Sequence, residues 1–175
     1  MTTKLLKIFA LAAAFTASAA SAAPVYLTLD TGVSHQTHAP ADVDFKNRQS
    51  MGATLGIQAT PDLAAEIAYK NLGQRTILGT DYSARVLSAS VVGSVPLTPK
   101  TSAFAKLGIA QSQTTTRVNS STHAESNTHL VAGVGIECPL PLKNTSVQTA
   151  YEIYPHFGHT GKSIQHLSVG AKYTF

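Results

Sequence analysis

The sequence contains no tryptophan, a single cysteine and few charged residues. Charged side chains make up 13% of the 175 residues, whereas about 25% is typical of soluble globular proteins. Disorder requires low hydrophobicity and high net charge, so a hydrophobic content of 43% argues against a disordered chain. Beyond the N-terminus, no stretch approaches the ~20 consecutive apolar residues of a membrane-spanning helix. The sequence therefore excludes a helical membrane protein and disfavours a soluble domain with a charged surface.

The scarcity of cysteine and of basic runs argues against two further classes, disulfide-stabilised proteins and nucleic-acid-binding proteins. Cys138 is the only cysteine, so the chain cannot form an intramolecular disulfide. The formal net charge is +4, of which Lys4 and Lys7 contribute two charges. Because no basic cluster is present, we expect no nucleic-acid partner. No motif in the sequence indicates a cofactor, and none is expected.

The first 22 residues have the pattern of a secretory signal peptide. Lys4 and Lys7 form a positive start, Ile8 to Ala20 form an apolar stretch, and Ala20-Ser21-Ala22 supplies the small residues of a cleavage site. No cysteine lies near this site, which argues against a lipoprotein anchor. We expect export, removal of residues 1–22, and one mature domain over residues 23–175.

The mature region alternates between apolar and polar residues with the period of two that is typical of β-strands. In the last such segment, Leu167, Val169 and Ala171 share one face, and Ser168 and Gly170 share the other. Eight segments have this pattern, at residues 25–34, 50–57, 63–70, 84–91, 103–110, 130–137, 147–154 and 166–175.

The connections between these segments alternate in length. Short, proline-containing turns are expected at Thr60 to Asp62, Pro96 to Thr101 and Pro139 to Asn144. Longer polar loops are expected at His35 to Asn47, Leu72 to Asp81 and Gln113 to Thr128, with a shorter fourth loop at Phe157 to Lys162. Such alternation is typical of outer-membrane barrels, which have short periplasmic turns and longer external loops.

One face of the strands is continuously apolar, and the other is rich in glycine, serine and threonine. Eight strands enclose only enough space for side chains, so small residues suit the interior of such a barrel. The apolar face then suits contact with lipid, and closure removes unpaired strand edges. We predict an all-β fold, an eight-stranded antiparallel up-and-down transmembrane β-barrel. The alternative is a soluble, lipocalin-like barrel.

The last three segments resemble a known family. The similarity rests on Gly133-Val134-Gly135-Ile136-Glu137, Tyr151-Glu152-Ile153-Tyr154, Phe157-Gly158 and the ending Leu167 to Phe175. These runs resemble the OmpA-like transmembrane domain and the small neisserial surface and opacity-protein relatives. The resemblance implies an integral protein of a Gram-negative outer membrane, without the peptidoglycan-binding domain of the long members. It also implies that Tyr173 and Phe175 form the signal read by the outer-membrane assembly machinery.

Seven charged residues fall on the small-residue face and are expected to form a salt-bridge network in the lumen. They are Asp30, Glu66, Lys70, Lys106, Glu137, Glu152 and Lys172. A buried charge must be paired or it costs several kcal/mol. We expect Lys106 to pair with Glu137 and with Glu66, and Glu152 to approach His166. An ion path along these residues is the alternative.

The histidines concentrate in the expected loops. Weak candidates for a surface metal site are His35, His38, His123, His129, His156 and His159. Imidazole is a common metal ligand and titrates near neutral pH. Since no pair has a diagnostic ligand spacing, polar loop composition is the simpler interpretation, and no metal is expected.

The sequence favours a structural or surface-interaction role, since loops on a rigid scaffold are common recognition sites. Expected partners are outer-membrane lipids and lipopolysaccharide, the assembly machinery and a host or surface ligand, with the barrel a monomer. One alternative is a narrow pore for ions or small solutes. The other is an enzyme that modifies lipid A or phospholipid, for which Glu152, His156 and Ser163 could form a triad. The serine motif of lipid A deacylases is absent, so no catalytic residue is assigned.

Overall fold

The structure, a computed structural model, describes residues 23–37, 48–77, 80–118, 121–157 and 162–175. The expected signal peptide, residues 1–22, lies outside this part of the chain. The strands are β1 (Val25–Thr37), β2 (Arg48–Thr60), β3 (Leu63–Ile77), β4 (Thr80–Thr98), β5 (Thr101–Val118), β6 (Ser121–Pro139), β7 (Thr145–Phe157) and β8 (Lys162–Thr174). No helix among the described residues is long and apolar enough to cross a membrane.

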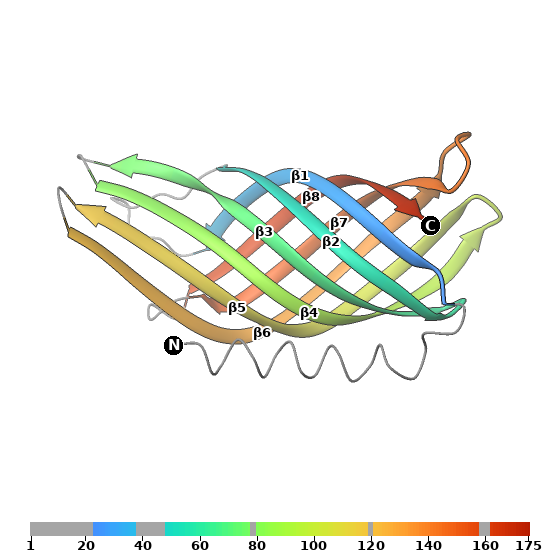
Figure 1. The fold of residues 1–175 in the computed structure, drawn as a ribbon, viewed down its shortest axis with the longest axis horizontal. Helices are drawn as coiled ribbons and strands as arrows, with labels where there is room; N and C mark the ends of the chain where they lie inside the picture. The colour runs from blue at the N-terminus through green and yellow to red at the C-terminus, as the bar shows by residue number, and fades with distance from the viewer. Residues whose placement is uncertain (1–22, 38–47, 78–79, 119–120, 158–161) are drawn as a thin grey trace.

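The strands form one closed antiparallel barrel in sequence order, which confirms the predicted fold (Figure 1). The barrel closes where β1 pairs with β8, from Tyr26 opposite Thr174 to Thr37 opposite Ser163. Closure leaves no edge strand in the wall, so the backbone donors and acceptors there are paired between neighbours.

The tight turns gather at one end of the barrel. The β2–β3, β4–β5 and β6–β7 connections lie at this end, together with the C-terminus (Figure 1). In the β6–β7 turn, the Leu140 N–H donates to the Thr145 carbonyl oxygen at 2.9 Å, and Asn144 takes a positive φ of 59°. The three short turns therefore occur where the prolines predicted them.

The expected loops at Leu72 to Asp81 and Gln113 to Thr128 are wrong as loops, because most of these residues continue the strands. β5 pairs with β6 as far as Val118 opposite Ser121, whereas the β6–β7 ladder stops at Ala132 opposite Ile153. The alternation of apolar and polar residues is lost in these segments, as in Gln113-Thr114-Thr115-Thr116, although threonine favours strands. The β5–β6 hairpin consequently extends beyond the β6–β7 ladder, while on its other side β4 pairs with β5 as far as Thr80 opposite Val118.

Side chains alternate between the lumen and the outer surface as predicted. The exposed large apolar residues in the wall include Leu29, Met51, Leu55, Tyr69, Val91, Leu107, Leu130, Val134, Ile136, Leu167 and Val169. Glycine allows large rings to lie flat inside the narrow lumen: a Cβ on Gly56 would collide with Tyr26, and one on Gly135 with Phe104. The small-residue face is therefore the inner face, and its glycines make room for aromatic rings.

Candidate functional site

A charged network fills the middle of the lumen, with the buried Glu152 at its centre. Glu152 Oε1 lies 2.9 Å from Lys106 Nζ, while Oε2 accepts hydrogen bonds from Lys70 Nζ and, at 2.9 Å, from the Tyr154 hydroxyl. On the adjacent strand His166 stands directly opposite Glu152, and its Nδ1 is 3.1 Å from Oε2. The expected approach of Glu152 and His166 is thus present, and the carboxylate has partners on both oxygens.

Two further carboxylates extend this network. Glu66 accepts a hydrogen bond from the Tyr26 hydroxyl at 2.9 Å and forms a salt bridge with Lys106 at 3.1 Å. Asp30 Oδ1 lies 3.6 Å from Lys70 Nζ. Each lysine therefore links two carboxylates across the lumen, so that charge is compensated within the barrel.

A second polar cluster lies nearer the tight turns, around Glu137. This carboxylate accepts hydrogen bonds from Ser146 at 2.6 Å and Gln148 at 3.0 Å, and it pairs with Lys172 at 2.9 Å. The Lys172 ammonium also lies 4.1 Å from the centre of the Tyr26 ring, within the range of a cation–π contact. Because Tyr26 contacts both clusters, the polar lumen is continuous.

The expected pair between Lys106 and Glu137 is wrong, since Glu137 pairs with Lys172 instead. Lys106 stands opposite Gly133 in the β5–β6 ladder, while Glu137 stands opposite Ser102, nearer the tight turns. Each residue lies a few positions from a tight turn in the sequence, which suggests one depth for both. Strands in a barrel are staggered, so equal counts from different turns correspond to different depths.

The space left inside the network is small. It amounts to a cavity of about 10 Å³, which is close to the minimum for one water molecule. The lining residues are Thr28, Asp30, Thr54, Glu66, Lys70, Lys106, Gln148, Ala150, Ser168 and Gly170. The described side chains therefore fill the lumen at this level.

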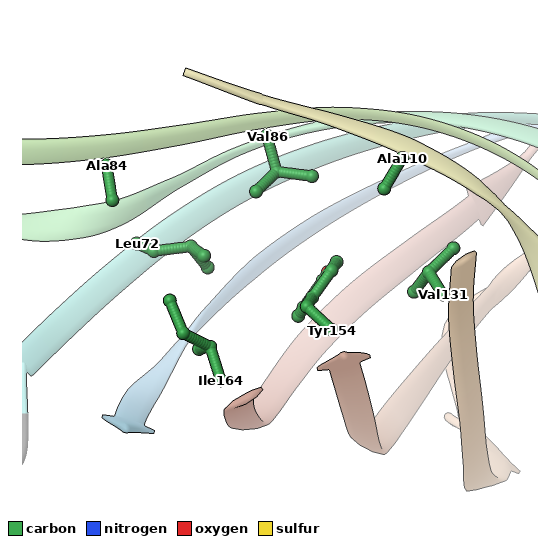
Figure 2. Packing of buried hydrophobic residues seen from close by; sticks show 7 residues of the cluster. All are labelled: Leu72, Ala84, Val86, Ala110, Val131, Tyr154 and Ile164. Carbon is green, nitrogen blue, oxygen red and sulfur yellow. The ribbon is translucent and has the colours of Figure 1, made fainter. Parts of the chain in front are cut away.

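An apolar plug, which the sequence analysis missed, lies beyond the network on the side away from the tight turns. Figure 2 shows its side chains converging from β3 to β8; the members are Leu72, Ala84, Val86, Ala110, Val131, Tyr154 and Ile164. Tyr154 is the inward residue that follows Glu152, and Leu72 is the one that follows Lys70. The sequence signal for the plug was an apolar residue at an inward position, where alternation predicts a polar one. Val86, next to the outward-facing Leu87, is an example. The expectation of a uniformly small and polar inner face was therefore incomplete.

Ser50, His166 and Glu152 have the connectivity of a hydrolase triad. Ser50 Oγ lies 2.7 Å from His166 Nε2, and His166 Nδ1 lies 3.1 Å from Glu152 Oε2. However, Ser50 is 2% exposed and His166 is 0% exposed, so a substrate has no access to the nucleophile. Ser163 stands opposite Thr37, away from Glu152 in the register, so the triad considered from the sequence is not assembled.

The candidate metal ligands do not converge in the described part of the chain. His35 is exposed on β1, and His129 is buried with its ring edge-on to Tyr154 at 6.2 Å. His123 and His156 belong to β6 and β7, and their side chains lie outside the description, as do His38 and His159 altogether. Among the described residues, no group of three or more histidine, cysteine, aspartate or glutamate side chains could hold a metal ion.

The two residues of the expected assembly signal lie at the end of the barrel where the chain closes. The Phe175 N–H donates to the Val25 carbonyl oxygen at 2.8 Å. The Tyr173 and Phe175 rings meet edge to face, 5.1 Å apart, and both are exposed on the outer surface. Phe175 thus extends the β1–β8 seam by one backbone hydrogen bond.

An apolar exterior around a closed antiparallel wall, with paired charges inside, defines a transmembrane β-barrel. The family model described as outer membrane protein beta-barrel domain matches residues 8–175. The chain belongs to this family of outer-membrane β-barrels.

Solved barrels share the fold at low sequence identity. Neisserial surface protein A is 14% identical, with a TM-score of 0.74, and the match covers 86% of this chain and 97% of that one. Ail of Yersinia pestis, solved with the heparin analogue sucrose octasulfate, is 15% identical, with a TM-score of 0.65 and coverages of 87% and 99%. The N-terminal barrel of Pseudomonas aeruginosa OprF is 12% identical, with a TM-score of 0.61 and coverages of 88% and 100%. No curated protein matches the sequence.

Proposed function

We propose that this outer-membrane barrel is a surface-interaction protein that binds a ligand through its β5–β6 hairpin. The observation that carries the proposal is the extension of paired β5 and β6 beyond the end of the β6–β7 ladder. The β5–β6 pairs from Gln113 opposite Ser126 to Val118 opposite Ser121 are formed mainly by polar residues. Backbone pairing restricts the chain over this stretch, which lowers the entropy cost of ordering it on binding.

The filled lumen favours this function over a narrow pore. A conducting path would have to pass both the salt bridges of Glu152 and the apolar plug around Tyr154. Side chains fill the lumen at two successive levels, the charged network and the apolar plug. A partner would therefore bind to the outside of the barrel.

The same burial argues against a barrel enzyme. Ser50 lacks access to substrate, and the lysines beside Glu152 already neutralise the carboxylate that would orient the histidine. We therefore propose a structural role for these hydrogen bonds, and that the wild-type protein does not react with a fluorophosphonate probe.

The proposal includes the location of the barrel and its general partners. Residues 1–22 direct export, and residues 23–175 insert as a monomer into the outer membrane through the assembly machinery. There the barrel contacts phospholipid and lipopolysaccharide, and it needs no cofactor or metal. A sulfated glycan is a suitable first probe, because Ail was solved with such a molecule.

The test removes the outer part of the β5–β6 hairpin and leaves the wall intact. Replacing residues 114–125 by Asn-Gly joins Gln113 to Ser126, a directly opposed pair, through a two-residue hairpin turn. The matched control replaces residues 75–82 in the β3–β4 hairpin, between the paired Gln74 and Ser83, in the same way. Both variants should migrate as folded barrels.

We expect cells that display the first variant to lose adhesion to host cells and to immobilised sucrose octasulfate, while the control retains most of it. Equal adhesion by wild type and both variants would contradict the proposal. Single-channel conductance by the wild-type protein in planar bilayers would favour the pore.

A further inference from the structure

Two of the tight turns share a sequence pattern that their role as connections does not require. The β4–β5 turn contains Pro96-Leu97-Thr98-Pro99-Lys100, and the β6–β7 turn contains Pro139-Leu140-Pro141-Leu142-Lys143. Each run is proline, leucine, two further residues and lysine. The β2–β3 turn instead contains Pro61 and Asp62, so the pattern is specific to two of the three turns.

The leucines of these turns continue the apolar outer face. Leu97 keeps the phase of the outward-facing Val91 and Val95, and Leu140 keeps that of Val134 and Ile136. Leu97 is 59% exposed and Leu142 is 68% exposed. Isolated apolar residues on a turn surrounded by water would be unfavourable, whereas here they border a surface that already faces lipid.

Both turns are held by local hydrogen bonds. The Leu142 carbonyl oxygen accepts from the Thr145 hydroxyl at 2.7 Å and from the Thr145 N–H at 3.3 Å. In the other turn, the Lys100 N–H donates to the Thr98 hydroxyl at 3.2 Å. Their exposed leucines are therefore presented on an ordered backbone.

Each pattern ends in an exposed lysine. Neither Lys100 nor Lys143 forms an ion pair with another described residue. A lysine next to an apolar side chain at a membrane boundary can extend its ammonium to the phosphates while its methylene chain stays in the apolar region. Anionic lipids attract such a group with about 1 kcal/mol per lysine.

We propose that these two turns bind anionic phospholipid of the periplasmic leaflet. Leu97, Leu140 and Leu142 contact the acyl chains, and Lys100 and Lys143 contact the headgroup phosphates. The β2–β3 turn, with Asp62 at its tip, stays outside this contact. This inference rests on membership of the outer-membrane family and is independent of ligand binding by the β5–β6 hairpin.

The absence of native tryptophan allows a direct test with single fluorescent reporters. Leu142→Trp and Leu97→Trp are introduced separately, with Asp62→Trp as the matched control. Each protein is folded into phosphatidylcholine vesicles that contain brominated phosphatidylcholine or brominated phosphatidylglycerol. We expect blue-shifted emission and bromine quenching at positions 142 and 97, and water-like emission at position 62.

The charge contribution is measured in the Leu142→Trp background, where quenching gives the relative association of the two lipids. Phosphatidylglycerol should be preferred by up to about fivefold, which corresponds to about 1 kcal/mol for one lysine. Lys143→Gln should abolish this preference, and Lys143→Arg should retain it. Water-like, unquenched emission at both 142 and 97 would overturn the proposal, and so would a preference that Lys143→Gln leaves unchanged.

Discussion

Lys106 on β5 lies 2.9 Å from Glu152 on β7, two strands that are not neighbours in the wall. Lys70 on β3 reaches the same carboxylate from a third direction. One glutamate thus connects three parts of the barrel through its interior, in addition to the hydrogen bonds that run around the wall. Glu152 is therefore the carboxylate that compensates the charge of both buried lysines, Lys70 and Lys106.

Glu152→Gln should destabilise the barrel strongly. The substitution keeps the shape of the side chain but leaves two buried ammonium groups with less compensating charge, which typically lowers the free energy of unfolding by about 4 kcal/mol. Urea unfolding in lipid vesicles measures the change. Glu137→Gln is the control, because that carboxylate is 25% exposed and its loss should be clearly smaller. Equal losses of unfolding free energy in the two variants would show that the central network contributes no more to stability than the cluster around Glu137.

Gly135→Ala tests the packing of aromatic rings inside the lumen. A Cβ at this position would collide with the Phe104 ring and with the Thr149 carbonyl oxygen, so both the ring and the adjacent β7 backbone must move. Overpacking of this kind costs roughly 1–3 kcal/mol. Gly93→Ala is the matched control, because nothing lies within 4 Å of its added Cβ. A barrel destabilised equally by both would indicate a general effect of glycine on the strands.

The orientation of the barrel predicts which end can be labelled from outside the cell. In a Cys138→Ser background, Arg117→Cys places a thiol on the β5–β6 hairpin, and Lys143→Cys places one on a tight turn. A membrane-impermeant maleimide should label position 117 in intact cells and position 143 only after permeabilisation. Labelling of position 143 in intact cells would reverse the topology.

Removal of Phe175 should lower the amount of folded protein in cells at high expression. The deletion removes the hydrogen bond to Val25, the ring contact with Tyr173 and the terminal aromatic residue that the family resemblance assigns to assembly. Heat-modifiable migration on semi-native gels measures the folded fraction. Tyr173→Ala is the comparison, because it removes the other ring and keeps the terminus. A wild-type folded fraction after the deletion would mean that Phe175 is one more surface aromatic.

The wall of the barrel could be predicted because a single physical constraint determines it. A strand between lipid and a narrow lumen must alternate, and Leu167 to Phe175 or Leu130 to Glu137 do so without interruption. The constraint ends where the hairpins leave the membrane. There, threonine-rich runs such as Thr114 to Thr116 form strands without alternation, and the sequence suggested a loop.

The lumen could be predicted only in part. Alternation placed the charged residues inside, and the short β7–β8 connection placed Glu152 near His166. The partner of Lys106 depends on the stagger of strands that are distant in sequence, which no local pattern contains. The plug was missed for a related reason, since Leu72 and Ile164 become neighbours only when the barrel closes.

The plug that fills the lumen and the outer part of the β5–β6 hairpin lie at different levels of the barrel. On β5 and β6 the plug is formed by Ala110 and Val131, whereas the ladder between these strands continues to Val118 opposite Ser121. The backbone pairing therefore extends well past the level at which described side chains fill the lumen. We expect the fold to tolerate substitutions beyond that level, so that this part of the hairpin can diverge in sequence faster than the wall that carries it.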